Sequence, residues 1–158
     1  MSEKSTANYK IDNLDKEILT NLMNDGRQSY TEIGKKLFCS SGTVHVRMKK
    51  MEKEGVVEKQ QLKVNYKKLG YDITAFLGIY LTNSSMYEQV AADLRKVKEM
   101  VGLHYTTGTY SMFAKIICKD TDHLMLVLHK KIQTIDGIQR TETLISLKEN
   151  IDRSLDLG

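Results

Sequence analysis

The order of apolar patterns in the second half of the chain limits its fold more than any other feature of the sequence. From Ile73 to Leu81, apolar residues recur at the period of two that predicts a strand. The patterns that follow predict, in chain order, a helix at 86–97, strands at 101–107 and 111–119, a helix capped by Asp122, and a strand at 138–147. This β-α-β-β-α-β order predicts an α+β fold, with a ferredoxin-like sandwich of two helices on one sheet.

Two helices cover only one face of such a sheet, so the apolar residues on its other face need a partner. These residues are Phe76, Tyr80, Phe113 and Ile117, or else their neighbours of opposite orientation. A second copy of the chain is the simplest partner, which predicts a homodimer.

Three short helices are predicted in the N-terminal third of the chain. Asp12 or Asn13 caps the first helix. Ser29 begins the second in a capping-box pattern with Glu32, and Ser40 caps the third. A tight turn between the second and third helices is typical of a helix-turn-helix.

The third helix has one apolar and one polar face. At 100° per residue, Val44, Met48 and Met51 share the apolar face. The residues that we predict to contact double-stranded DNA are Ser40, Ser41, Gly42, Thr43, His45, Val46, Arg47, Lys49, Lys50 and Lys53.

The chemistry of this set suits a major groove. Hydroxyl groups at a helix N-terminus bind phosphates or base edges, and a valine contacts a thymine methyl group. Lysines neutralise phosphates. Arg47 lies beside the apolar stripe, so a structural ion pair with a nearby glutamate is an equal alternative to a phosphate contact.

Charge is unevenly distributed along the chain. Residues 1–70 hold 14 Lys and Arg against 9 Asp and Glu, whereas residues 71–158 hold 10 against 11. A basic module that meets a polyanion, followed by a near-neutral module, accounts for this asymmetry. The alternative is a small helical bundle with a solvated basic face.

Residues 56–64 alternate well enough for a short ribbon. One interpretation is a wing whose Lys59 and Lys63 contact phosphates; the other is a strand that pairs with its copy in a dimer. We therefore predict a winged helix-turn-helix domain at 9–64, a hinge at 65–70 and a second domain at 71–150.

Two polar loops lie in the second domain. Hydroxyl groups, a glycine that exposes backbone amides and an amide side chain suit a small zwitterion bound at an assembly interface. The two loops are Tyr105–Ser111 and Gln133–Gly137. The alternative is that both are ordinary turns.

Seven segments resemble, in order, the Lrp/AsnC (feast/famine) transcriptional regulators. They are Asp12–Asp15, Ser40–Arg47, Met51–Val56, Lys68–Asp72, Tyr105–Ser111, Lys131–Asp136 and Thr141–Ile145, and the last three resemble the asparagine-responsive branch. The resemblance implies an N-terminal winged helix-turn-helix, a C-terminal ferredoxin-like effector domain, and dimers that assemble further into octamers. It also implies a small amino acid such as asparagine bound between dimers, at the two polar loops. The effector-binding residues implied by the resemblance are Thr106, Thr107, Gly108, Tyr110 and Ser111 in one loop, and Gln133, Thr134, Ile135 and Asp136 in the other.

The chain departs from the family pattern at two positions. Phe38 stands where the family usually places the turn glycine, so a turn of different construction is expected. Ser41 replaces a common proline at the first helical position.

Other classes of protein fit the sequence less well. A siroheme decarboxylase-like enzyme shares the two-domain architecture, but only His104, His123 and His129 lie in the second domain to serve it. A sensing module without DNA contact is a third reading, against which the lysines of the third helix argue. We expect no membrane span, secretory signal, metal or cofactor, and a cytoplasmic protein whose Cys39 and Cys118 stay reduced.

Overall fold

The computed structural model of the chain describes residues 9–58 and 62–157. It divides into two compact units, residues 1–63 together with 151–158, and residues 64–150. The predicted α+β class and the order of elements in both units are confirmed. No described helix is long and apolar enough to cross a membrane.

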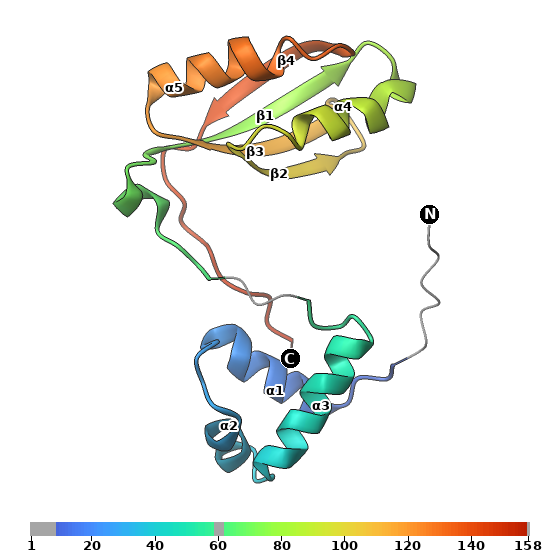
Figure 1. Cartoon of the computed structure of the whole chain (residues 1–158), viewed down its shortest axis with the longest axis vertical. Coiled ribbons are helices and arrows are strands. Elements are labelled where there is room, and N and C mark those ends of the chain that lie inside the picture. The colour runs from blue at the N-terminus through green and yellow to red at the C-terminus, as the bar shows by residue number, and fades with distance from the viewer. Residues whose placement is uncertain (1–8, 59–61, 158) are drawn as a thin grey trace. The chain divides into compact units, whose positions relative to one another are not determined.

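The first unit contains three helices, α1 (Asn13–Asn24), α2 (Tyr30–Lys36) and α3 (Ser41–Lys53) (Figure 1). Each contributes apolar residues to one small core. The fully or almost fully buried members are Ile18, Ile33, Val44, Met48 and Met51. The predicted apolar face of the third helix is therefore the face that packs inside the unit.

Side-chain caps fix where these helices begin. Asp12 caps α1, because its carboxylate accepts a hydrogen bond from the Asp15 amide at 2.9 Å and the Asp15 carboxylate accepts one from the Asp12 amide at 3.1 Å. The predicted capping box of Ser29 with Glu32 is present at α2. Ser40 accepts from the Thr43 amide at 3.0 Å and caps α3. All three predicted caps are confirmed, and the choice at α1 is Asp12.

The turn between α2 and α3 contains a left-handed residue. Phe38 has φ of +53°, and the Cys39 amide donates to the Gly34 carbonyl at 2.9 Å, as in a Schellman motif. A Cβ on Gly34 would lie 2.7 Å from the Cys39 carbonyl oxygen, so this glycine lets the turn close. The expected turn of different construction is wrong: Phe38 itself adopts the left-handed conformation, at a cost of about 1–2 kcal/mol.

The described residues of one chain form no ribbon at 56–64, and the alternative of a strand that pairs with its copy in a dimer stays a prediction. Val56–Glu58 and Leu62–Val64 lie outside any strand, and Lys59 lies outside the described residues. Lys63 forms an ion pair with Asp152 at 2.6 Å. A strand needs a neighbouring strand for its hydrogen bonds, and the described part of one chain pairs none with this segment.

The second unit is a four-stranded antiparallel sheet of order β2-β3-β1-β4 with two helices. A single turn of 3-10 helix, Tyr66–Leu69, occupies the predicted hinge. The elements are β1 (Ile73–Leu81), α4 (Tyr87–Leu94), β2 (Met100–Tyr105), β3 (Met112–Cys118), α5 (Thr121–Leu126) and β4 (Ile138–Ile145).

The helical boundaries differ from the predicted ones in two places. The cap of α5 is Asp120, whose carboxylate accepts from the His123 amide at 2.7 Å, and not Asp122. The helix then continues in π geometry through Val127–Ile132. The helix predicted at 86–97 ends at Leu94, three residues early.

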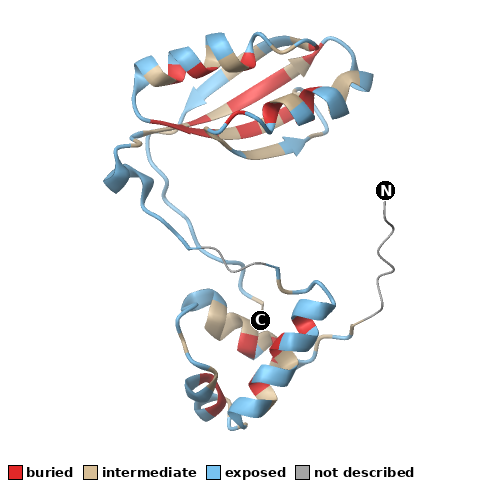
Figure 2. Cartoon of the chain, viewed as in Figure 1, coloured by how far each residue is buried: buried red, intermediate tan, exposed pale blue. Residues whose placement is uncertain are grey.

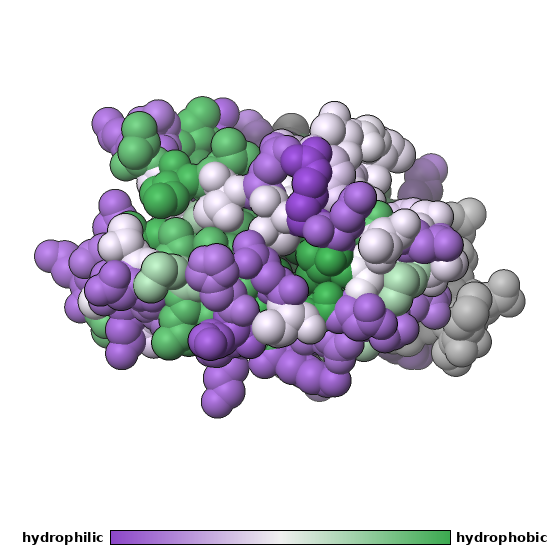
Figure 3. Space-filling model, turned by 90° about the horizontal axis from the view of Figure 1, so that it is seen from above, coloured by the Kyte–Doolittle hydropathy of each residue, from purple (hydrophilic) through white to green (hydrophobic). Residues whose placement is uncertain are grey.

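Both helices pack on the same face of the sheet, where the buried residues gather (Figure 2). Ala75, Leu77 and Ile79 of β1 are fully buried in that core. On the opposite face, Phe76 and Phe113 stack with ring centroids 5.8 Å apart and stay half-buried. Figure 3 shows that apolar residues reach the molecular surface in patches between hydrophilic side chains. Within the described residues of the second unit, one face of the sheet therefore lacks a cover.

Candidate nucleic-acid interface and effector site

The polar face of α3 is exposed along its whole length. Ser40, Ser41, Gly42, His45, Val46, Lys49, Lys50 and Lys53 are exposed, and Thr43 and Arg47 are half-buried. Val46 has 66% of its surface exposed although it is apolar. Eight of the ten residues predicted from the sequence are therefore exposed, and those opposite the buried face of Val44, Met48 and Met51 include Lys49, Lys50 and Lys53.

Two hydroxyl groups at the N-terminus of α3 are hydrogen-bonded to each other. The oxygens of Ser40 and Thr43 lie 2.9 Å apart while Ser40 also caps the helix. The neighbouring Ser41 hydroxyl is exposed. A helix N-terminus with free amides and exposed hydroxyl groups is suited to binding a phosphate.

Arg47 connects α3 to the start of α1. Its Nη1 lies 2.6 Å from Asp12 and 2.8 Å from Asp15, whose side chain is 1% exposed. Hydrogen bonding to Asp12, and then to Asp15, raises the pKa of Arg47, and the Arg47 hydrogen bond lowers the pKa of Asp12. Of the two alternatives for Arg47, the structure shows the ion pair, with aspartates in place of the expected glutamate.

The lysines of α3 have different surroundings. The Lys50 ammonium lies 4.8 Å from the centre of the Tyr9 ring, in a cation–π contact. Lys49 and Lys53 are exposed. Lys49 and Lys53 are therefore the lysines of this surface that are best placed for phosphates.

The two predicted effector loops lie at the same end of the sheet. The Ser111 amide donates to the Ile79 carbonyl at 3.0 Å, and the Thr82 amide donates to the Gly137 carbonyl at 3.0 Å. Since Ile79 and Thr82 stand at the C-terminal end of β1, the loops flank that end from its two sides. This proximity follows from the central position of β1 in the sheet, which sequence spacing alone does not reveal.

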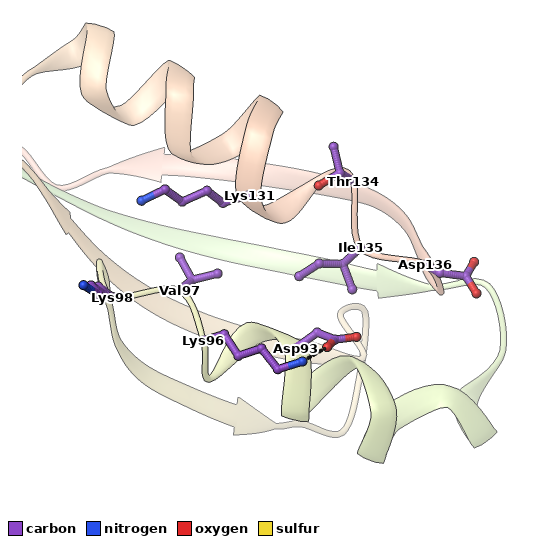
Figure 4. A pocket seen from close by; sticks show the side chains of 8 residues that line it. All are labelled: Asp93, Lys96, Val97, Lys98, Lys131, Thr134, Ile135 and Asp136. Atoms are coloured by element: carbon purple, nitrogen blue, oxygen red, sulfur yellow. Dashed lines mark hydrogen bonds and ion pairs between the residues drawn. The ribbon is translucent and has the colours of Figure 1, made fainter.

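A groove of about 570 Å³ opens beside the second of these loops (Figure 4). Its lining residues are Asp93, Lys96, Val97, Lys98, Lys131, Thr134, Ile135 and Asp136. Of the described residues, those of the loop at 106–111 are absent from the lining. One chain therefore brings three predicted effector residues to a groove together with three lysines that sequence reasoning missed.

Lys96 and Lys98 were missed because the helix was predicted to continue through Val97. With α4 ending at Leu94, Lys96 and Lys98 fall in a turn that faces the groove, where Lys96 pairs with Asp93 at 2.7 Å. A pair of lysines directly after an apolar helical stripe was the available signal.

Tyr110 of the first loop lies on the open face of the sheet. Its hydroxyl donates to Glu142 at 2.8 Å, and the Tyr80 hydroxyl donates to the same carboxylate at 3.0 Å. A Cβ on Gly78 would meet the Tyr110 ring at 2.3 Å, so only glycine leaves room for it. The Tyr110 and Tyr80 hydrogen bonds lower the pKa of Glu142.

The other loop residues bond mostly to their own chain. Thr106 donates to the Tyr110 carbonyl at 2.8 Å, and Thr134 donates to the Lys130 carbonyl at 3.2 Å. The Gln133 amide donates to Thr141 at 3.3 Å. Thr107 and Gly108 are exposed at the tip of the first loop, and Gly108 has φ of +107°.

Glu99 forms a nearly buried ion pair that sequence reasoning did not identify. Its carboxylate lies 2.6 Å from Lys131 and 3.2 Å from His123, and its side chain is 11% exposed. The His123 Nδ1 accepts from the Lys119 amide at 3.1 Å, so both ring nitrogens of His123 contact groups of the second unit itself. Within the described ranges, no group of three or more metal-binding side chains is present.

A helix-turn-helix with an exposed basic third helix, followed by a ferredoxin-like domain, defines a DNA-binding regulator with a separate ligand-binding domain. Family models bear this out: residues 11–58 match one described as winged helix-turn-helix DNA-binding, and residues 74–155 match the Lrp/AsnC ligand binding domain. The chain belongs to the Lrp/AsnC family of transcriptional regulators, which are not enzymes.

Comparison with individual relatives narrows the family assignment to an AsnC-like regulator. The chain is 45% identical to regulatory protein AsnC of Escherichia coli strain K12 over 148 residues, which cover 94% of this chain and 97% of that one. It is 42% identical to regulatory protein AsnC of Haemophilus influenzae over 93% of this chain and 98% of that one. The solved structure of E. coli AsnC superposes with a TM-score of 0.89 at 44% identity, covering 94% and 99% of the two chains.

Proposed function

We propose that the chain binds double-stranded DNA as a homodimer, through the exposed face of α3 in each subunit, and that a small amino acid changes its DNA binding or assembly. The observation that carries the proposal is the orientation of α3. Its methionine face is buried in the core and its lysine face is exposed. That is the arrangement a recognition helix requires.

The uncovered face of the sheet supports the dimer. Phe76 and Phe113 remain half-buried there, and a second copy of the same face would cover them. A two-fold axis would also pair two recognition helices, which read half-sites about 34–36 Å apart. Further assembly of dimers into an octamer is what the family resemblance implies, and it forms part of the proposal.

Asparagine is the proposed effector. The exposed Gly108 offers backbone amides for a carboxylate, Asp136 offers a charge for an ammonium group, and Gln133 offers an amide for the side chain. The 45% identity to a protein named AsnC and the resemblance of both loops to the asparagine-responsive branch support this choice. Only one loop lines the groove of a single chain, so we place the complete site where dimers meet.

The test is a thermal-shift screen of the twenty amino acids, with sedimentation velocity on every amino acid that binds. A ligand that binds the folded protein raises the unfolding temperature by mass action. We expect L-asparagine to raise it and to change either the sedimentation coefficient or the affinity for DNA. Thr107→Val and Gln133→Ala should remove this response while DNA binding survives.

The matched control is Gln89→Ala, which removes an exposed amide from α4. It should respond as the unaltered protein does. A normal asparagine response in both loop variants would place the site elsewhere, and no response to any amino acid would reject the effector proposal. Action on DNA also implies a cytoplasmic protein.

A further inference from the structure

Among the described residues of the first unit, Phe38 is the most exposed large apolar one, and its backbone is also strained. It has 98% of its surface exposed, and its φ of +53° falls in the left-handed region. Left-handed backbone is unfavourable for a bulky side chain. The folded unit therefore gains almost no burial from this ring while it carries the backbone strain.

The position of Phe38 explains why a glycine would fit better. It follows the Leu37 cap of α2, and the next amide, of Cys39, donates back to Gly34 at 2.9 Å. In this motif the residue after the cap is left-handed and is usually glycine. A phenylalanine at such a position stabilises neither the helix end nor the core.

Phe38 also lies close in the chain to the N-terminus of α3, the proposed recognition helix. Phe38 lies two residues before Ser40, the cap of α3, and helix-turn-helix proteins contact base edges with the N-terminal residues of that helix. Apolar side chains, phenylalanine included, contact the methyl group of thymine in the major groove. Val46, an apolar residue of α3 with 66% of its surface exposed, is a second side chain available for such a contact.

We propose that Phe38 is a further DNA-contacting residue, whose ring packs against a thymine methyl group beside the N-terminus of α3. This rests on the proposed DNA binding and adds to it a specificity-determining residue outside α3. The contact is apolar, so it contributes to sequence preference and not to the salt dependence that phosphate contacts produce.

The experiment compares the full-length protein with Phe38→Gly on a duplex selected by the unaltered protein from a randomised pool. We expect Phe38→Gly to raise the unfolding temperature of the first unit by about 4–8 °C, because it removes the backbone strain. We expect it to weaken binding to the selected duplex about tenfold, with an unchanged slope of affinity against salt.

A second variant and a second duplex isolate the contact. Phe38→Asn keeps a residue that tolerates the left-handed conformation and removes the ring, so it should lose the same affinity without the flexibility of glycine. Replacing each thymine of the duplex in turn by deoxyuridine removes one methyl group. At one position, the replacement should weaken binding of the unaltered protein and leave Phe38→Gly unaffected.

Several results would overturn the proposal. They are unchanged affinity of both variants, a changed salt slope, or a methyl-group dependence that persists in Phe38→Gly. A loss of self-association in the variants, seen by sedimentation without DNA, would instead assign the ring to a protein contact. If the unaltered protein selects no duplex at all, the proposed DNA binding itself fails, which is a distinct result.

Discussion

The two units of the chain differ in how much of their function a single copy contains. The first unit buries one face of α3 in its own core and presents the other face, complete, to solvent. The second unit has the larger core but leaves a sheet face with Phe76 and Phe113 uncovered, and only part of its predicted effector residues lines the groove.

The difference follows from the geometry of helices and sheets. A short helix buries a stripe of residues and keeps its remaining surface for a ligand. A sheet has two faces, and two helices on one side leave the other for a partner. We therefore expect each chain to present a complete DNA-contacting helix, and we expect the effector site to be completed only in the assembly.

The largest effect is expected from a charge on the uncovered sheet face. Phe113→Asp would place an unpaired carboxylate in the proposed dimer interface, which costs several kcal/mol when buried. We expect self-association to weaken at least a hundredfold, and DNA affinity to fall because paired half-sites can no longer be read together. Sedimentation velocity over a range of concentrations measures the first effect.

The matched control is Met125→Asp, which changes a methionine that is 56% exposed on α5. It adds the same charge to the same unit but not to the sheet, and it should leave the dimer intact. If Phe113→Asp remains dimeric with a normal circular dichroism spectrum, the sheet face is not the dimer interface. A single copy of the second unit then needs no partner on that face.

The next largest effect is expected from removing the Arg47 ion pair inside the first unit. Arg47→Ala leaves the buried Asp15 without its positive partner, although Tyr9 still donates to that carboxylate at 2.9 Å. We expect the free energy of unfolding of this unit to fall by about 2–3 kcal/mol, measured by denaturant titration. Arg95→Ala, an exposed arginine of the second unit, is the control and should change stability by less than about 0.5 kcal/mol.

The alternative for Arg47 gives the opposite result. An arginine that serves the DNA would leave stability unchanged when removed, and would lower the slope of affinity against salt by about 1. Its removal therefore decides whether Arg47 belongs to the scaffold of the first unit or to its ligand surface.

Most of the fold could be predicted because it depends on local patterns. The caps at Asp12, Ser29 and Ser40 each involve residues three positions apart, and strand alternation involves neighbours. Asp120 was missed in favour of Asp122, because two nearby aspartates offer equal caps and only the extended backbone at Asp120 distinguishes them.

Contacts between distant residues could not be predicted. Asp12 and Asp15 lie 35 and 32 positions before Arg47, so no spacing rule connects them. The same holds for Glu99 and Lys131, and for the loops that β1 brings to one end of the sheet. The described part of one chain forms no ribbon at 56–64 for a related reason: alternation predicts a strand but does not supply the strand it pairs with.

A smaller effect distinguishes the lysines of the DNA surface. Lys49→Ala with Lys53→Ala should weaken binding to all sequences and lower the salt slope by about 2, because each exposed lysine neutralises about one phosphate. Lys50→Ala should lower it less, since its ammonium lies over the Tyr9 ring. Fluorescence anisotropy at several salt concentrations measures the slopes.

Lys96→Ala with Lys98→Ala is the matched control, because it removes the same charge from the second unit. An equal loss of slope in the control would show that both units contact phosphates. DNA contact would then not be confined to the first unit.

The smallest effect is the acid sensitivity of the second unit. Burial alone would raise the pKa of Glu99, but the hydrogen bonds from Lys131 and His123 outweigh it, and the pKa lies below its ordinary value. The stabilisation by the ionised carboxylate is therefore complete above the ordinary pKa and is lost as the pH falls through the lower, folded-state value.

Glu99→Gln should be less stable than the unaltered protein by about 1.5 kcal/mol at pH 7. That gap should begin to narrow below about pH 4.5 and close as the pH falls through the folded-state pKa, as measured by denaturant titrations across the range. Glu88→Gln, an exposed glutamate of α4, is the control and should show no comparable gap at pH 7. A gap for Glu99→Gln that persists unchanged in acid would mean that the lost stability comes from packing and not from the charge of this carboxylate.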